Sequence, residues 1–145
     1  MEPVLEIEDL SISFRTHLVD IPAVTGFGCT VGPGESVGLV GESGSGKSTV
    51  AFAIMRYLGG NGRITGGAIR FLGRDLAQMP ERELRAIRGR QIAMVYQEPT
   101  SSLNPVMKIG RQLAEPLVVL DGQSWPEASA RAREMLEAVR LPDPD

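Results

Sequence analysis

Apolar and polar positions alternate along the first part of the chain. Residues 4–15 follow this two-residue period, which predicts half-buried β-strands in two short stretches. Residues 23–31 form a second β-rich stretch, and residues 68–72 repeat the alternation further along. We therefore expect an antiparallel β region at the N-terminus.

Two apolar runs lack this alternation. They cover residues 36–40 and 92–96. Short continuous apolar runs are typical of strands buried on both faces, as in the parallel sheets of α/β proteins. The sequence thus predicts two central strands of such a sheet.

Helical spacing of apolar residues follows the first of these runs. It covers residues 47–58, and a short charged helix is expected over residues 81–88. Ser124 and Glu127 have the spacing of a capping box, which predicts a helix from there to about residue 141. This order of strands and helices predicts an α/β fold with an antiparallel annex.

Composition narrows the class of protein. With 145 residues, the chain suits one domain or part of one. Its net charge of −3 argues against nucleic acid as a partner, because such proteins need a clustered basic face. A single cysteine excludes a disulfide framework, and no apolar run approaches the roughly 18 residues of a membrane span. We expect a soluble, cytoplasmic protein.

A glycine-rich loop follows the first apolar run. Residues 41–48 match the phosphate-loop pattern G-x-x-x-x-G-K-[ST] in full. Backbone N–H groups of such a loop, at a helix N-terminus, bind phosphate oxygens. Lys47 would contact the β- and γ-phosphates, and the Ser48 hydroxyl would be a ligand of Mg²⁺. The predicted nucleotide-binding residues are Gly41, Glu42, Ser43, Gly44, Ser45, Gly46, Lys47, Ser48 and Thr49.

A second candidate residue ends the apolar run at 92–96. Gln97 would lie at the carboxyl end of a parallel strand, where it faces the phosphate loop. The sequence around it, at residues 96–105, is Tyr-Gln-Glu-Pro-Thr-Ser-Ser-Leu-Asn-Pro.

With this segment the chain resembles the ATP-binding subunits of ABC transporters, and most of all the oligopeptide, dipeptide and nickel importers. The resemblance rests on residues 41–48, on Ile87-Arg88-Gly89 and on the run at 97–105, and it covers essentially all 145 residues. It implies a P-loop NTPase core with a partial RecA-like sheet. The parts it implies within one nucleotide-binding domain are a β annex at about 1–35 and 62–75, a P-loop core at 36–58 and 90–97, and the start of a helical subdomain at about 100–145.

The resemblance also implies roles and partners. Phe14 would stack on adenine, and Gln97 would contact Mg²⁺ and the attacking water, so that Lys47 and Gln97 would be catalytic and Ser48 and Gln97 metal ligands. ATP and Mg²⁺ would be the cofactors. Transmembrane permease subunits, a second nucleotide-binding domain and, indirectly, a solute-binding protein would be the partners in import of peptides or a related small solute. The chain would then lie at the inner face of the cell membrane.

The sequence departs from the family by what its 145 residues lack. They contain no signature near Leu-Ser-Gly-Gly-Gln, no Walker B aspartate followed by a catalytic glutamate, and no switch histidine. We therefore expect an N-terminal fragment that is inactive by itself.

Two alternatives stay open. Residues 117–121 have four apolar residues and an acid, as in a Walker B strand, and would make Asp121 the Mg²⁺ ligand of a self-contained kinase or NTPase. Against this, Gly122 follows, and residues 106–120 read more easily as one helix broken near Pro116. The other alternative is a nucleotide-binding module that does not hydrolyse.

Overall fold

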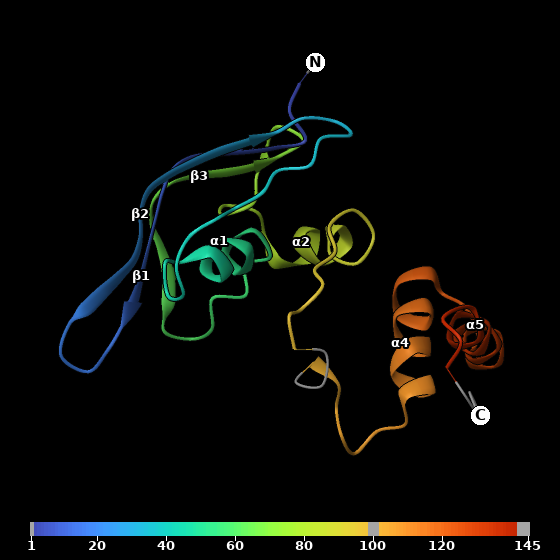
Figure 1. The fold of residues 1–145 in the computed structure, drawn as a ribbon. Helices are drawn as coiled ribbons and strands as arrows, with labels where there is room; N and C mark the ends of the chain where they lie inside the picture. Colours follow the sequence, from blue (N-terminus) through green and yellow to red (C-terminus); the bar gives the residue numbers. More distant parts are fainter. Residues whose placement is uncertain (1, 99–101, 142–145) are drawn as a thin grey trace. The chain divides into compact units, whose positions relative to one another are not determined.

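The structure is a computed structural model that describes residues 2–98 and 102–141 (Figure 1). The chain forms two compact units, Met1–Leu84 and Arg85–Asp145. The elements of the first unit are β1 (Leu5–Arg15), β2 (Asp20–Val31), α1 (Lys47–Ile54), β3 (Gly62–Phe71) and β4 (Arg74–Asp75). After them come α2 (Glu81–Ile87), α4 (Ile109–Asp121) and α5 (Trp125–Ala138).

The predicted β region is confirmed as one antiparallel sheet with the strand order β2-β1-β3-β4. Within residues 4–15, β1 is a single long strand from Leu5 to Arg15 instead of two short stretches. A bulge explains the change in pattern, because Asp9 has a left-handed φ of 47° and the register with β3 shifts between Glu8 and Ser11. The bulge lets Leu10 face inward like Ile7, three positions before it.

The core of the first unit lies between this sheet and α1, which runs along one side of it (Figure 1). Leu10, Ile12 and Ile69 are fully buried on the sheet, and Val50 and Ala53 are buried on α1. Burial of a side chain as large as Leu or Ile contributes about 1.5–3 kcal/mol. This packing fixes α1, and with it the loop from which the helix starts.

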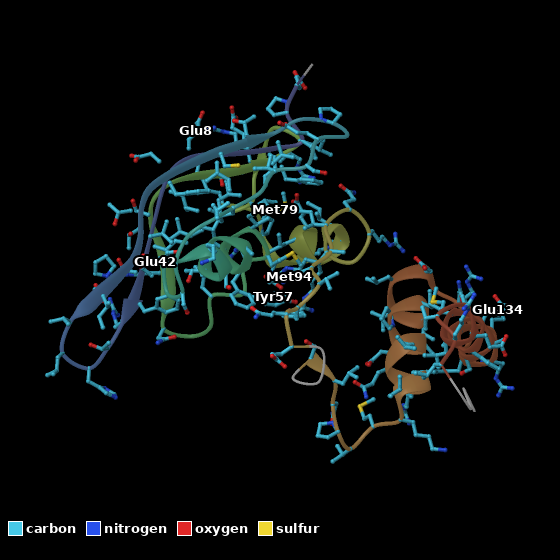
Figure 2. All side chains as sticks on the ribbon, in the orientation of Figure 1. Glu8, Glu42, Tyr57, Met79, Met94 and Glu134 are labelled. Carbon is cyan, nitrogen blue, oxygen red and sulfur yellow. The ribbon has the colours of Figure 1, made fainter. Side chains whose placement is uncertain are left out.

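The other face of the sheet is charged. Glu8 lies on that face (Figure 2), and its Oε2 forms a salt bridge of 2.6 Å with Nη1 of Arg70. Glu6 pairs with the same guanidinium at 3.4 Å. The hydrogen bond and charge of Glu8, more than those of Glu6, raise the pKa of Arg70 above its ordinary value.

The two predicted central strands are not formed, which corrects that part of the sequence prediction. Residues 36–40 are irregular, and residues 92–96 make only the bridge between Arg88 and Ile92. Val40 is 93% exposed and Val95 is 95% exposed. A strand that is buried on both faces needs neighbours for its backbone hydrogen bonds, and no strand of residues 2–98 and 102–141 pairs with either run.

The helices differ from the prediction mainly at their ends. The helix expected to reach residue 58 ends at Ile54, and Arg56 has a left-handed φ of 52°. The helix expected at residues 106–120 begins at Ile109 and is not broken near Pro116, which lies inside α4. Its packing on α5 offsets the hydrogen bond that the proline cannot donate.

The second unit is built around α4 and α5. Ala114, Ala128 and Ala132 are buried between them. The predicted capping box is present at the start of α5, although this helix ends at Ala138. There, the backbone N–H and the hydroxyl of Ser124 donate to Oε2 of Glu127 at 3.0 and 2.6 Å. These hydrogen bonds lower the pKa of the Glu127 carboxyl.

Candidate functional site

The phosphate-loop sequence leads directly into α1. Gly46 is the N-cap residue of this helix and Lys47 is its first residue. The first N–H groups of a helix have no partner within it, and the helix dipole places partial positive charge there. The first turn of α1 carries no acidic side chain that would compete for these groups. The loop therefore presents a place for a phosphate group.

The ammonium group of Lys47 closes back on this loop. Its Nζ donates to the carbonyl oxygens of Gly41 and Glu42 at 2.8 and 2.6 Å, and to Oγ of Ser45 at 3.2 Å. These acceptors surround the charge with loop atoms, so the lysine holds the two ends of the loop together. Phosphate oxygens are stronger partners for an ammonium than neutral carbonyls, because their hydrogen bonds are charge-assisted.

The end of the loop packs against a bulge in β2. Val24 pairs with Ile12 and Pro22 with Ser13, so that Ala23 is an extra residue in β2. At Gly46 a Cβ would lie 2.7 Å from the Ala23 carbonyl oxygen and 3.0 Å from Cγ2 of Val24. Gly46 also has a left-handed φ of 89°. Only glycine satisfies both conditions, and the contact places the loop on the Ile12 face of the sheet.

A cavity of about 260 Å³ lies beside the loop. Its walls are apolar side chains of β2, α1 and the run at 36–40, together with the loop. The lining residues are Val24, Phe27, Leu39, Val40, Gly41, Ser45, Gly46, Lys47 and Val50.

Phe14 lies on the same face of the sheet as the loop. It follows Ile12 by two residues in β1, and it pairs with Ile21 of β2 and Gly62 of β3. Two residues of strand span about 7 Å. The half-buried Phe14 therefore lies on the same face of the sheet as the phosphate loop, two residues along β1 from Ile12, which is the partner of the Val24 that Gly46 packs on.

Gln97 and Asp121 belong to the second unit. Gln97 is exposed and lies in irregular chain, not at the end of a strand, so its predicted role stays a prediction. Asp121 is the last residue of α4, and its Oδ1 accepts a hydrogen bond of 3.3 Å from Nη2 of Arg90. The interpretation of residues 117–121 as a Walker B strand is wrong, because these residues are helical.

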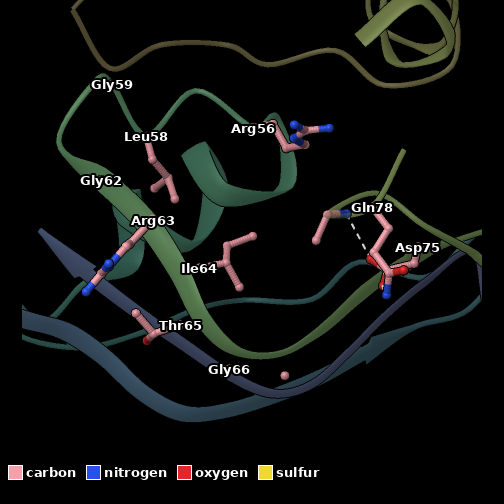
Figure 3. A pocket seen from close by; sticks show the side chains of 12 residues that line it. Arg56, Leu58, Gly59, Gly62, Arg63, Ile64, Thr65, Gly66, Asp75 and Gln78 are labelled. Atoms are coloured by element: carbon pink, nitrogen blue, oxygen red, sulfur yellow. Dashed lines mark hydrogen bonds between the residues drawn. The ribbon is translucent and has the colours of Figure 1, made fainter. Parts of the chain in front are cut away.

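A larger cavity of about 530 Å³ borders β3 and the turn before it (Figure 3). Its charged side chains bond to the protein itself. Arg56 donates to the carbonyl oxygens of Leu76 and Met79, and Oδ2 of Asp75 accepts from Nε2 of Gln78 at 2.9 Å (Figure 3). We therefore place the candidate nucleotide site at the loop and not in this cavity.

Sequence reasoning named Ser45 as a nucleotide-binding residue but missed its contact within the loop, where its hydroxyl accepts from Lys47 and lies 2.7 Å from where a Cβ of Gly41 would be. It also missed the Ala23 bulge, which has no local signal because it depends on the register of two strands.

Comparisons with known proteins agree with the geometry. A model of the family described as ABC transporter matches residues 24–145. The oligopeptide transport ATP-binding protein OppD of Salmonella typhimurium is 47% identical over 140 residues, which are 97% of this chain and 42% of that protein. OppD of Escherichia coli is 44% identical over 98% of this chain and 42% of that protein. A putative peptide import ATP-binding protein of Brucella abortus is 46% identical and covers 97% and 42%.

The chain thus spans about 42% of the length of these curated relatives. Two solved structures share the fold. A dimeric ATP-binding cassette in a post-hydrolysis state bound to ADP and Pi has a TM-score of 0.75 and 22% identity, over 96% of this chain and 58% of that one. A dimeric bacterial ABC transporter cassette has a TM-score of 0.78 and 23% identity, with the same coverage. The predicted α/β P-loop NTPase fold class is confirmed.

Proposed function

Since the chain belongs to the ABC transporter family, we propose that it is the ATP-binding part of a transporter ATPase that couples ATP binding and hydrolysis to import of peptides or a related small solute. The observation that carries the proposal is the phosphate loop at the N-terminus of α1, with Lys47 at its centre. The names of the relatives, an oligopeptide transport and a putative peptide import ATP-binding protein, support the solute class.

The proposed nucleotide site combines the phosphate loop with Phe14 on the same face of the sheet. Backbone N–H groups at the start of α1 and the Lys47 ammonium bind the phosphates, and the Phe14 ring stacks on adenine. Glu42, Ser43 and Gly44 complete the loop around the phosphates, and Thr49 contributes from the first turn of α1. Stacking of a purine on an aromatic ring needs no hydrogen bonds to the edge of the base. We therefore expect Phe14 to stack on other purine nucleotides as well.

The donor set fits Mg²⁺. This ion takes oxygen ligands and keeps few protein contacts beside the phosphates, and the exposed Ser48 hydroxyl in the first turn of α1 is such a ligand. When bound, the ion neutralises charge on the β- and γ-phosphates. Gln97 is the second proposed ligand and the residue that orients the attacking water.

The organisation and the partners are part of the proposal. We propose a β annex at about residues 1–35 and 62–75, a P-loop core at 36–58 and 90–97, and the start of a helical subdomain at about 100–145. Permease subunits in the membrane, a second nucleotide-binding domain and a solute-binding protein are the proposed partners, at the inner face of the cell membrane. In the described part of the chain, no helix has the length and apolar character to cross a membrane.

Hydrolysis distinguishes this proposal from its alternatives. In ABC ATPases the facing half of the site comes from the signature of a partner, and the 145 residues contain no signature and no Walker B pair. We therefore expect the chain alone to bind Mg-ATP and to release no phosphate.

Steady-state phosphate release by the purified chain, measured beside Lys47→Ala to correct for contaminating ATPases, tests this expectation. Release above that control would contradict the proposal and favour a self-contained NTPase. Release that stays absent after a partner signature and Walker B segment are supplied would favour the non-hydrolysing module.

A further inference from the structure

Gly62 is a glycine that the backbone conformation does not require. It opens β3, and its φ is not in the left-handed region. An added Cβ would nevertheless lie 2.5 Å from the carbonyl oxygen of Leu58, 2.8 Å from Cβ of Leu58 and 2.8 Å from Cε1 of Phe14. Lack of space therefore accounts for the glycine, and one of the atoms that occupy the space belongs to the proposed adenine platform.

The turn before β3 closes the other side of this contact. Leu58 and Gly62 flank the turn, and the Leu58 side chain lies beside β3 (Figure 3). The backbone N–H of Arg15 donates to the carbonyl oxygen of Asn61 at 2.7 Å, which ties the turn to β1 next to Phe14. A side chain at position 62 would thus press on the Leu58 backbone and on the Phe14 ring. Rotation of the ring relieves only the second contact, so both the ring and the turn would have to shift.

We propose that Gly62 is a positioning residue for the nucleobase. Because Gly62 has no side chain, the Phe14 ring can pack against β3. In this position the ring can stack on the base of a nucleotide whose phosphates are bound at the loop. The inference rests on the proposed function and extends it, because it assigns control of base affinity to a residue that touches no nucleotide atom.

The first test compares Gly62→Ala with Gly60→Ala. A Cβ at Gly60 meets no atom within 4 Å, and Gly60 has no left-handed φ, so this variant is a matched control from the same turn. Titration calorimetry measures the binding of ADP and of tripolyphosphate, which lacks the base. We expect Gly62→Ala to bind ADP about tenfold more weakly and tripolyphosphate unchanged, because only base stacking is lost. Gly60→Ala should match the unsubstituted protein for both ligands.

The second test is a double-mutant cycle with Phe14→Ala. If Gly62 acts through the ring, Gly62→Ala has no further effect on ADP affinity once Phe14 is alanine. Equal loss of ADP and tripolyphosphate binding, additive effects in the cycle, or ADP affinity of Gly62→Ala equal to that of the unsubstituted protein would each overturn the inference. An unsubstituted protein that binds neither ligand would instead overturn the proposed function, and the inference with it.

Discussion

Lys47→Ala is expected to weaken Mg-ATP binding roughly 10- to 100-fold, since hydrogen bonds to charged groups contribute about 1.5–3 kcal/mol each. The Nζ atom lies within 3.2 Å of the Gly41 and Glu42 carbonyl oxygens and of Oγ of Ser45, so it is held inside the loop. The fold should persist, because these acceptors are exposed loop atoms and not part of the core. Equilibrium titration with a fluorescent ATP analogue, paired with circular dichroism, measures both effects.

The chain offers a matched control for this substitution. Lys108 is the only other lysine in the sequence, and it is exposed before α4 in the second unit. Lys108→Ala removes the same charge and should leave ATP affinity unchanged. Equal affinities of the two variants would show that Lys47 acts only through net charge, and unchanged binding by Lys47→Ala would remove the phosphate-loop assignment.

Gly46→Ala is expected to lower the free energy of unfolding by about 2–4 kcal/mol and to weaken ATP binding as well. About 1–2 kcal/mol follows from the left-handed φ of 89°, and the rest from overpacking against the Ala23 carbonyl. Because the contact lies at the start of α1, relief of the clash moves the N–H groups that would bind phosphate. Urea denaturation and ATP titration give the two quantities.

Two other glycines separate the causes of this effect. Gly44 has a left-handed φ of 81°, but a Cβ there meets nothing within 4 Å, so Gly44→Ala carries the strain without the clash. Gly38→Ala carries neither. The expected order of destabilisation is Gly46, then Gly44, then Gly38. If Gly44→Ala and Gly46→Ala lowered the free energy of unfolding equally, the close contact of Gly46 with the Ala23 bulge would contribute nothing to stability.

Local sequence signals predicted the features that local interactions determine. The phosphate loop was readable because each motif position has its own chemical reason, and the start of α5 because Ser124 and Glu127 bond to each other across three residues. The antiparallel sheet was readable from alternation, except where the Asp9 bulge shifts it. Bulges at Asp9 and Ala23 depend on the register with neighbouring strands, so no short pattern indicates them.

The errors about buried strands have one physical cause. An apolar run indicates that its side chains favour burial. Burial in a sheet also needs neighbouring strands, and the run itself does not show whether they are present. Residues 36–40 and 92–96 carry the pattern of central strands, yet Val40 and Val95 are almost fully exposed. Residues 117–121 carry the same kind of run but lie in a helix, where Leu117 and Val118 pack against the core of α4 and α5 and Val119 is exposed.

The claim that residues 41–49 form an ATP site is tested most directly by titrating the ¹⁵N-labelled protein with Mg-ATP and following the backbone amide resonances. The account predicts that the largest shifts fall on residues 41–49, with a smaller set around Phe14, and that Lys47→Ala reduces both. Shifts concentrated in α4 and α5, or resonances of residues 41–49 that do not move at saturating ATP, would contradict it.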